Sequence, residues 1–209
     1  MILLPCFYAI ADASCFRSIG ELTAFAEELM AAGCTLLQYR NKSGNARAML
    51  EQARELRRQS RARAPAPQLR LVMNDRADLC LVAEFDGVHV GQDDLSPESV
   101  RGIIGSDRWL GVSTHNPEQV READRTSADY LAIGPVFSTL SKERADPVVG
   151  LEGVRRARQL TRKPLVAIGG ITRANAVSVI EAGADSVAVI SDLLREPRKS
   201  AEEFFRILR

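Results

Sequence analysis

A cluster of polar residues stands at the end of an early apolar run, and its spacing suits the binding of an anion. The segment Gln38-Tyr39-Arg40-Asn41-Lys42 follows two leucines. In a strand, alternate side chains share a face, so Gln38, Arg40 and Lys42 are expected on one side. Two cations and an amide arranged in this way can hold phosphate oxygens. The alternative is that Arg40 and Lys42 form a solvated pair in a loop.

Carboxylates follow the next two apolar runs. Asp75 comes after Asn74 at the end of one run, and Asp93 and Asp94 follow the other. If the runs are neighbouring parallel strands, Asp75 and one of the later aspartates can share a cation such as Mg²⁺, which favours one or two carboxylates together with substrate phosphates. The alternative role for Asp75 and Asp94 is helix N-capping. We predict a metal site because both carboxylates would lie beside the cationic cluster.

Three further polar residues belong to the fourth and fifth apolar runs. Ser113 and His115 end the fifth run, and His89 lies inside the fourth between two valines. Ser113 can hydrogen-bond the edge of a substrate. His115 could act as a base, but no cysteine or carboxylate stands at a spacing that completes a nucleophilic triad, so we rank Ser113 above it. We expect His89 in the core or behind the residues that contact a ligand.

Paired glycines follow the seventh apolar run, as Gly169-Gly170, and Ile190-Ser191 ends the eighth. Such glycines let the backbone approach an anion closely, and the loops after strands seven and eight form the phosphate site of many barrels. The alternative is that they serve only a tight turn. The segment 134–150 is too polar and too rich in Gly and Pro for a helix, so we expect a long functional loop that carries Lys142.

Short apolar runs alternate with longer amphipathic stretches along the chain. The runs cover residues 6–10, 35–39, 69–73, 87–90, 109–112, 130–133, 165–168 and 186–190, with helical patterns between them, as at 19–32 and 46–63. Eight βα units in about 200 residues predict an α/β fold, a single (β/α)8 TIM barrel over residues 1–209. An open doubly wound sheet is the alternative, but the first run is not followed by G-x-G-x-x-G.

Two further patterns concern the outside of this barrel. An aspartate preceded by a small or apolar residue begins three of the runs, as Asp86, Asp129 and Asp185, which suggests one repeated unit. Arginines crowd the expected helix at 46–63, Arg57 among them, and we expect them on a solvated outer face.

Composition excludes several classes of protein. Lys and Arg number 28 against 27 Asp and Glu, so no positive excess is present for a nucleic-acid backbone. No apolar run approaches the roughly 20 residues that span a bilayer, and the apolar start lacks a basic leader. We therefore predict a cytoplasmic protein with neither a nucleic-acid nor a membrane partner. Four scattered cysteines and two histidines predict neither a disulfide framework nor a zinc site, so a metal here should be bound by oxygen.

A series of short motifs runs through the chain in a set order. They are Q-x-R-x-K at 38–42, N-D-R at 74–76, G-x-H-x-G-Q-x-D at 87–94, G-x-S-x-H at 111–115, G-P-x-x-x-T at 134–139, Lys142, I-G-G-I at 168–171, and an apolar residue before Ser191. In this order they resemble the thiamine phosphate synthase family over essentially the whole chain. The resemblance implies a transferase that joins 4-amino-2-methyl-5-(diphosphooxymethyl)pyrimidine to thiazole ethyl phosphate, giving thiamine phosphate and pyrophosphate in thiamine diphosphate biosynthesis.

The resemblance also implies a role for each site residue. The pyrimidine diphosphate is held by Gln38, Tyr39, Arg40, Asn41, Lys42, Asn74, Ser113 and Lys142. The thiazole phosphate is held by Thr139, Leu140, Ser141, Gly170, Ile190 and Ser191, and Mg²⁺ by Asp75 and Asp94. The catalytic residues are Arg40, Lys42, Ser113 and Lys142, because cations and Mg²⁺ stabilise a departing diphosphate without a covalent nucleophile. Asn41 and Ser141 depart from the family pattern, in which an acidic residue and Thr are usual.

Other functions share this barrel. A thiazole tautomerase of the same family uses the thiazole phosphate site for a proton transfer and needs neither diphosphate nor magnesium. A non-catalytic regulator that binds a phosphate ligand and a different phosphate-binding barrel isomerase are further alternatives. The joint presence of Asp75, Asp94 and Lys142 favours the synthase, and the sequence sets neither the oligomeric state nor whether the thiazole is used in carboxylated form.

Overall fold

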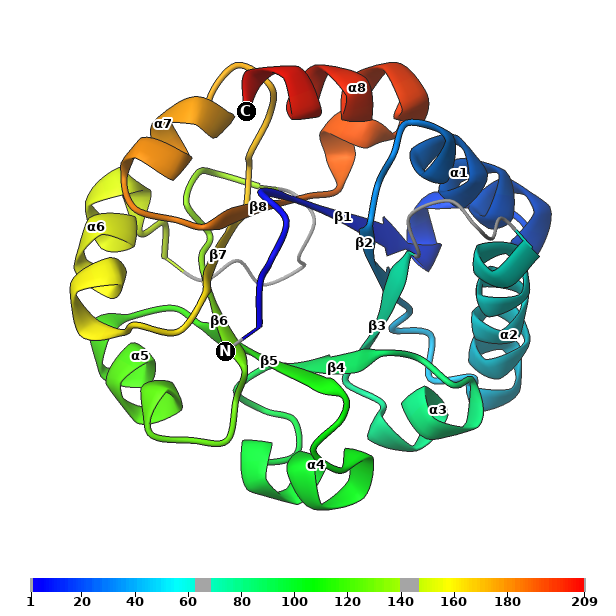
Figure 1. Ribbon diagram of the computed structural model, residues 1–209, viewed down its shortest axis with the longest axis horizontal. Coiled ribbons are helices and arrows are strands. Elements are labelled where there is room, and N and C mark those ends of the chain that lie inside the picture. The colour runs from blue at the N-terminus through cyan, green and yellow to red at the C-terminus, as the bar shows by residue number, and fades with distance from the viewer. Residues whose placement is uncertain (1, 63–68, 140–146, 209) are drawn as a thin grey trace.

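Eight parallel strands close into a ring in the computed structural model, which describes residues 2–62, 69–139 and 147–208. The strands follow one another in chain order, and β8 pairs with β1. Figure 1 looks along the barrel and shows the strands inside a ring of helices. The predicted (β/α)8 barrel is confirmed, and the open doubly wound sheet is wrong.

The strands match the apolar runs closely. They are β1 (Phe7–Asp12), β2 (Leu36–Arg40), β3 (Arg70–Asn74), β4 (Gly87–Val90), β5 (Trp109–Thr114), β6 (Tyr130–Ile133), β7 (Leu165–Ile168) and β8 (Ser186–Val189). The helices are α1 (Ile19–Ala31), α2 (Ala46–Ala62), α3 (Ala77–Val82), α4 (Pro97–Ile104), α5 (Pro117–Asp124), α6 (Gly150–Leu160), α7 (Ala176–Glu181) and α8 (Pro197–Ile207). Two short 3-10 helices, η1 (Ala13–Cys15) and η2 (Ser191–Leu193), follow β1 and β8.

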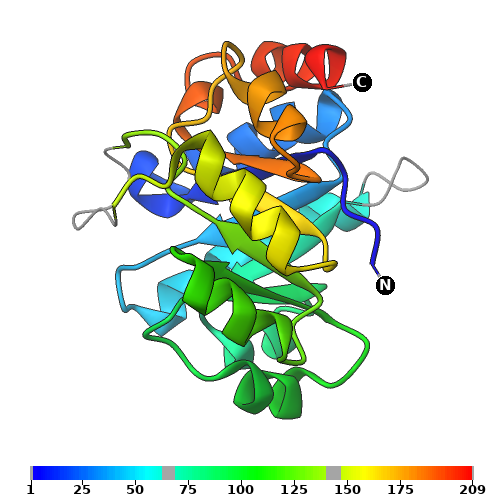
Figure 2. The same cartoon turned by 90° about the vertical axis from the view of Figure 1, so that its left-hand side faces the viewer.

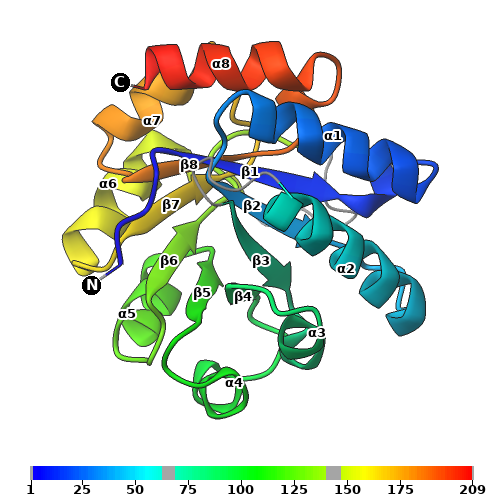
Figure 3. The same ribbon diagram turned by 45° about the vertical axis from the view of Figure 1, so that its right-hand side comes forward.

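The helices pack around the strands as a continuous outer layer. Figure 2, turned by 90°, shows helices covering the sheet, and Figure 3 shows α1 and α2 beside β1 and β2. The last helix, α8, contacts α1, so the outer ring closes where the chain ends. None of the described helices is both long and apolar enough to cross a membrane.

Strand alternation divides the core into two parts. Outward side chains such as Phe7 and Leu37 pack against the helices in the larger cluster. Inward side chains fill the lumen, among them Tyr8, Leu36 and Tyr130. Because side chains two residues apart share a face, the residues that end each strand continue this inward row at the carboxyl rim. That rim is where the predicted site residues stand.

Three aspartates at the amino ends of β4, β6 and β8 explain the recurring sequence theme. Each carboxylate accepts a 2.7 Å hydrogen bond from a backbone N–H near the start of the preceding strand and also pairs with an arginine of a helix. The sets are Asp86 with Leu71 and Arg57, Asp129 with Leu110 and Arg101, and Asp185 with Leu165 and Arg158. We call these sets the Arg–Asp clamps. Each clamp joins two adjacent strands and a helix at the end opposite the cavity.

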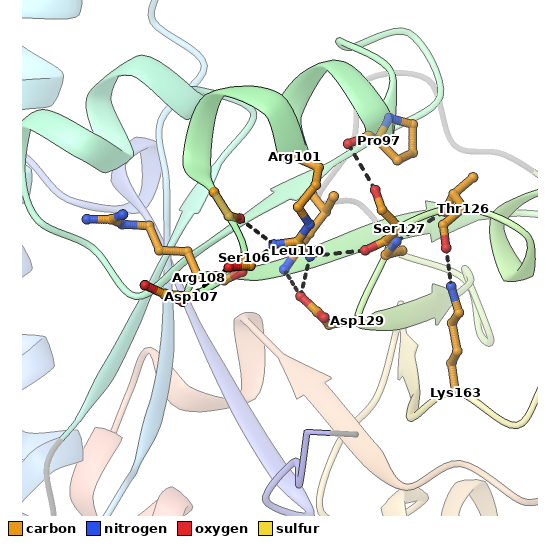
Figure 4. A network of polar contacts seen from close by, with 12 residues as sticks. Pro97, Arg101, Ser106, Asp107, Arg108, Leu110, Thr126, Ser127, Asp129 and Lys163 are labelled. Atoms are coloured by element: carbon orange, nitrogen blue, oxygen red, sulfur yellow. Dashed lines mark hydrogen bonds and ion pairs between the residues drawn. The ribbon is translucent and has the colours of Figure 1, made fainter.

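Figure 4 shows the middle clamp in detail. Arg101 pairs with Asp129 at 2.6 Å and also donates to the backbone carbonyls of Gly105 at 2.8 Å, Arg108 at 2.7 Å and Ser127 at 3.0 Å. A single guanidinium, with its planar set of donors, therefore holds two loops together.

The clamps correct one expectation about the helix surface. Arg57 was expected on a solvated face, but it is 6% exposed and donates to Asp86 and to the carbonyl of Glu84. Its guanidinium also lies over the ring of Phe85, 5.7 Å from the centroid. The prediction was wrong because helical spacing identifies a charged face but not the loop that covers it.

We expect Asp129→Ala to lower the free energy of unfolding by about 2 kcal/mol, because it leaves the Leu110 N–H without its acceptor and the half-buried Arg101 without its carboxylate. The matched control is Glu118→Ala, which removes an exposed ion pair with Arg121 on α5 and should cost less than about 1 kcal/mol. Urea denaturation of both variants measures the difference. Equal losses would contradict a stabilising role for the clamp.

Candidate active site

A cavity opens at the carboxyl ends of the strands and extends into the lumen. Many of the predicted substrate-binding residues line it: Gln38, Arg40, Asn74, Ser113, Thr139, Gly170, Ile190 and Ser191. Tyr8, His89 and His115 line it as well. Residues from most of the strands and from loops far apart in the sequence thus converge on one pocket, the usual place of the active site in a barrel of this class.

Arg40 is held in the cavity by a buried carboxylate that sequence reasoning missed. Asp12, the last residue of β1, is 3% exposed and lies beside Arg40 in the strand register. It forms an ion pair with the Arg40 guanidinium and accepts hydrogen bonds from the backbone N–H of Ser14 at 3.0 Å and its hydroxyl at 2.7 Å. The pairing orients the guanidinium toward the ligand space. A signal was present, since Asp12 ends its apolar run as Arg40 does.

Two of the predicted substrate-binding residues face away from the cavity. Alternation turns Tyr39 outward, where its ring packs edge-on against Phe85 and its hydroxyl donates to Gln52 of α2. Asn41 donates to the same Gln52 oxygen at 3.0 Å and to the Tyr39 hydroxyl at 3.1 Å. Neither side chain is therefore placed to contact a ligand in the cavity. Together they anchor the turn that carries Lys42, because Asn41 also accepts from the backbone N–H of Ser43 at 2.8 Å.

Lys42, Asp75 and Asp94 form a cluster at the rim. The Lys42 ammonium lies 2.5 Å from an Asp75 carboxylate oxygen. Burial raises the pKa of Asp75, the hydrogen bond from Lys42 opposes that rise, and a hydrogen bond with the Asp94 carboxyl adds to it. Two carboxyl groups this close repel each other when both are ionised. A cation placed between them would remove that repulsion.

The helix-capping alternative does not describe these carboxylates. α3 begins after Arg76 without a side-chain cap, and α4 is capped by Ser96. Asp94 instead accepts a 2.8 Å hydrogen bond from the backbone N–H of Gly91 within its own turn. Asp75 has a φ of 61°, in the left-handed region that residues other than glycine rarely adopt. Its strained backbone is held by an N–H donated to the His89 carbonyl at 2.8 Å.

Asn74 lines the cavity and carries a buried donor that is not used. The residue is 7% exposed, and its Nδ2 has no hydrogen-bond partner among the described residues. A buried amide donor without an acceptor costs about 1–3 kcal/mol. A ligand acceptor in the cavity would satisfy it.

The loops after β6, β7 and β8 meet on the far side of the cavity. Gly170 has a φ of +64°, and a Cβ there would lie 2.6 Å from the Ser138 carbonyl oxygen and 2.8 Å from the Phe137 Cβ. Arg173 ties the β7 loop to η2, since its backbone N–H and its Nε both donate to Asp192 at 2.9 Å. Gly170 and Ser191 are therefore held in fixed positions relative to each other. The remaining predicted residues, Leu140, Ser141 and Lys142, lie outside the described part of the chain.

Comparisons with known proteins identify the family of this chain. The chain belongs to the thiamine monophosphate synthase family, whose sequence model matches residues 7–193. It is 60% identical over 208 residues to the thiamine-phosphate synthase of Koribacter versatilis, covering 98% of this chain and 96% of that protein. It is 45% identical over 184 residues to the thiamine-phosphate synthase of Chloroflexus aurantiacus, covering 88% and 82%.

A solved structure supports the same relationship. Thiamine phosphate pyrophosphorylase from Pyrococcus furiosus superposes with a TM-score of 0.84 at 32% identity, covering 97% of this chain and 94% of that one. The family resemblance inferred from the motifs is confirmed.

We expect Gly170→Ala to destabilise the protein more than Gly44→Ala. Both glycines have a positive φ, so each substitution strains the backbone by about 1–2 kcal/mol. At Gly170 the new methyl group meets the backbone of another loop, whereas at Gly44 no atom of the described residues lies within 4 Å of it. Chemical denaturation of the two variants gives the comparison. Equal losses would show that the β6 loop moves aside freely.

Proposed function

We propose that this protein is a thiamine-phosphate synthase, which condenses the aminopyrimidine diphosphate with thiazole ethyl phosphate in thiamine biosynthesis. The feature that suits this chemistry best is the cluster of Lys42, Asp75 and Asp94 at the carboxyl rim of the barrel, where Arg40, which lines the cavity, ends β2. This observation carries the proposal, because a departing diphosphate needs cations at the place where its negative charge develops. Family membership and two curated relatives of that name support the same function.

The reaction separates charge at one carbon. The bond between the methylene carbon and the diphosphate oxygen breaks, and its electron pair leaves with pyrophosphate. The methylene cation that remains is conjugated with the aminopyrimidine ring. The thiazole nitrogen then forms the new bond to this carbon and completes thiamine phosphate.

The chain's own residues bind and orient the diphosphate. Arg40 presents the N–H groups that Asp12 does not use, and Lys42 supplies a second positive charge. Asn74 offers its free Nδ2 donor to a substrate acceptor. The phosphate of the thiazole is assigned to the opposite side of the cavity, at Thr139, Gly170, Ile190 and Ser191. The two phosphate groups then lie on either side of the reacting carbon.

The paired carboxylates fit Mg²⁺. Asp75 and Asp94 provide oxygen ligands close to each other, and no cluster of three or more His, Cys, Asp or Glu residues that could hold a metal occurs in the described residues. Mg²⁺ usually binds through one or two carboxylates plus substrate phosphates, so a two-carboxylate site next to a diphosphate suits it. When bound, it would neutralise charge on the leaving group. Ligation by Asp75 and Asp94, contact by Leu140 and Ser141, the role of Lys142 and a cytoplasmic location all remain predictions from the sequence.

The purified protein, given both substrates and Mg²⁺, should form thiamine phosphate and pyrophosphate, and a chelator should abolish the reaction. Chromatographic detection of both products tests this directly. Conversion of the thiazole phosphate alone, without pyrophosphate release, would favour the tautomerase. Binding without turnover would favour a regulator.

We expect Asp75→Asn and Asp94→Asn to lower turnover at least about tenfold, equivalent to roughly 1.4 kcal/mol of transition-state stabilisation, while the fold is retained. Asp93→Asn removes the same charge from an exposed neighbour outside the cluster, and it controls for net charge. The variants should need more Mg²⁺ for half-maximal activity, unlike Asp93→Asn. Steady-state kinetics across a Mg²⁺ titration measure this, and an unchanged Mg²⁺ requirement would contradict ligation.

A further inference from the structure

A continuous chain of hydrogen bonds crosses the lumen beneath the cavity. Gln38 Nε2 donates to the Tyr8 hydroxyl at 2.9 Å, and the Tyr8 and Tyr130 hydroxyls lie 3.1 Å apart. Tyr130 lies 3.1 Å from His89 Nδ1, and His89 Nε2 lies 2.8 Å from the Ser113 hydroxyl. This series of hydrogen bonds begins at Gln38 and ends at Ser113, and both residues line the cavity. We call it the lumen chain.

The amide of Gln38 determines the direction of every bond in the lumen chain. Its Nε2 only donates, so the Tyr8 hydroxyl accepts there and must give its own hydrogen to Tyr130. The hydrogen of Tyr130 then finds an acceptor only if His89 Nδ1 carries no proton, and a buried hydroxyl hydrogen without an acceptor would be costly. A neutral histidine with a bare Nδ1 has its proton on Nε2, and that N–H donates to Ser113.

The two ends of the lumen chain consequently present opposite hydrogen-bonding groups to the cavity, an acceptor at one end and a donor at the other. Gln38 keeps its carbonyl oxygen, an acceptor. The Ser113 oxygen already accepts from His89, so its own hydrogen is available as a donor.

Burial keeps the lumen chain neutral and intact. It raises the pKa of Tyr8 to about 12 and that of Tyr130 well above its usual range. Both hydroxyls therefore retain the hydrogens that the lumen chain needs.

The space for the lumen chain depends on Gly111 of β5, where a Cβ would lie 2.2 Å from the Tyr130 ring and 2.4 Å from His89 Nδ1. The glycine of the G-x-S-x-H motif thus makes room for the two residues that lead to the serine.

We propose that Tyr8, Tyr130 and His89 are positioning residues that set the hydrogen-bond polarity of the pyrimidine pocket, which makes the enzyme selective for a 4-aminopyrimidine over a 4-oxopyrimidine. This inference rests on the proposed function and on the family resemblance, which assigns Gln38 and Ser113 to the pyrimidine diphosphate. A 4-aminopyrimidine offers an N–H donor beside an unprotonated ring nitrogen, which matches a carbonyl acceptor and a hydroxyl donor. The 4-oxo ring carries the reverse pattern, a carbonyl beside a ring N–H, and would leave polar groups unpaired.

The tautomer of His89 tests the inference without any substrate. In protein labelled with ¹⁵N-histidine, with the resonances assigned by a His115→Gln variant, we expect His89 Nδ1 to show the shift of an unprotonated nitrogen and Nε2 that of an N–H. Tyr130→Phe, which keeps the ring but removes the donor to Nδ1, should give a mixture of tautomers. Tyr39→Phe removes another buried hydroxyl, outside the lumen chain, and should leave the His89 shifts unchanged. A proton on Nδ1 in the parent protein would overturn the proposed direction.

Selectivity is the second readout. The parent should favour the 4-amino diphosphate over its 4-oxo analogue by at least about 100-fold in kcat/KM. Tyr130→Phe, and independently Tyr8→Phe, should lower this ratio about tenfold, with the KM for thiazole phosphate unchanged. A ratio that stays at the parent value in both folded variants refutes the inference. Failure of the parent to turn over the amino substrate would refute the proposed function instead, while the tautomer measurement would still stand.

Discussion

The whole molecule depends on the closed ring of backbone hydrogen bonds between its parallel strands. Closure leaves no strand edge, and it fixes which side chains point into the lumen at every second position. All the strands run in the same direction, so all their carboxyl ends lie on one rim. Residues as distant in sequence as Asp12, Asn74 and Ser191 are thereby brought to the same end of the barrel. The site is a consequence of this geometry before any particular side chain is considered.

The two ends of the barrel use charged residues differently. At the amino end, the Arg–Asp clamps pair each carboxylate with both a guanidinium and a strand N–H, so these three carboxylates are satisfied. At the carboxyl end, Asp75 has a strained backbone, its carboxyl lies against that of Asp94, and the Asn74 amide has no acceptor for its Nδ2 among the described residues. Strain and unpaired groups gathered at one end of a barrel favour that end as the place where a ligand binds. The amino end of the barrel thus uses its charged residues to stabilise the fold, and the carboxyl end is where the candidate active site lies.

Within the lumen, the hydroxyls of the two buried tyrosines both have partners. Tyr8 and Tyr130 fill the lumen with apolar rings and carry hydroxyls that need bonds once buried. They meet each other, and the remaining bonds go to Gln38 and His89. The same residues therefore pack the core and determine how the floor of the cavity presents donors and acceptors. Packing and recognition are not separable here.

The sequence by itself determined the barrel, the position of its strands and the end at which the site lies. Alternation within a strand is a local property, so Gln38 and Arg40 could be placed on one face from their spacing alone. Alternation also turns Tyr39 outward, where it packs against Phe85, although the family motif predicts that it binds substrate.

Only the tertiary structure decided which polar groups meet. Asp12 with Arg40, Arg57 with Asp86, and Tyr8 with Tyr130 are pairs from different elements, the last separated by 122 residues. Spacing along the chain specifies a face but neither the register between strands nor the distance across the lumen. Those quantities are set by barrel closure and by side-chain packing, because a hydrogen bond forms only when two atoms come within about 3 Å.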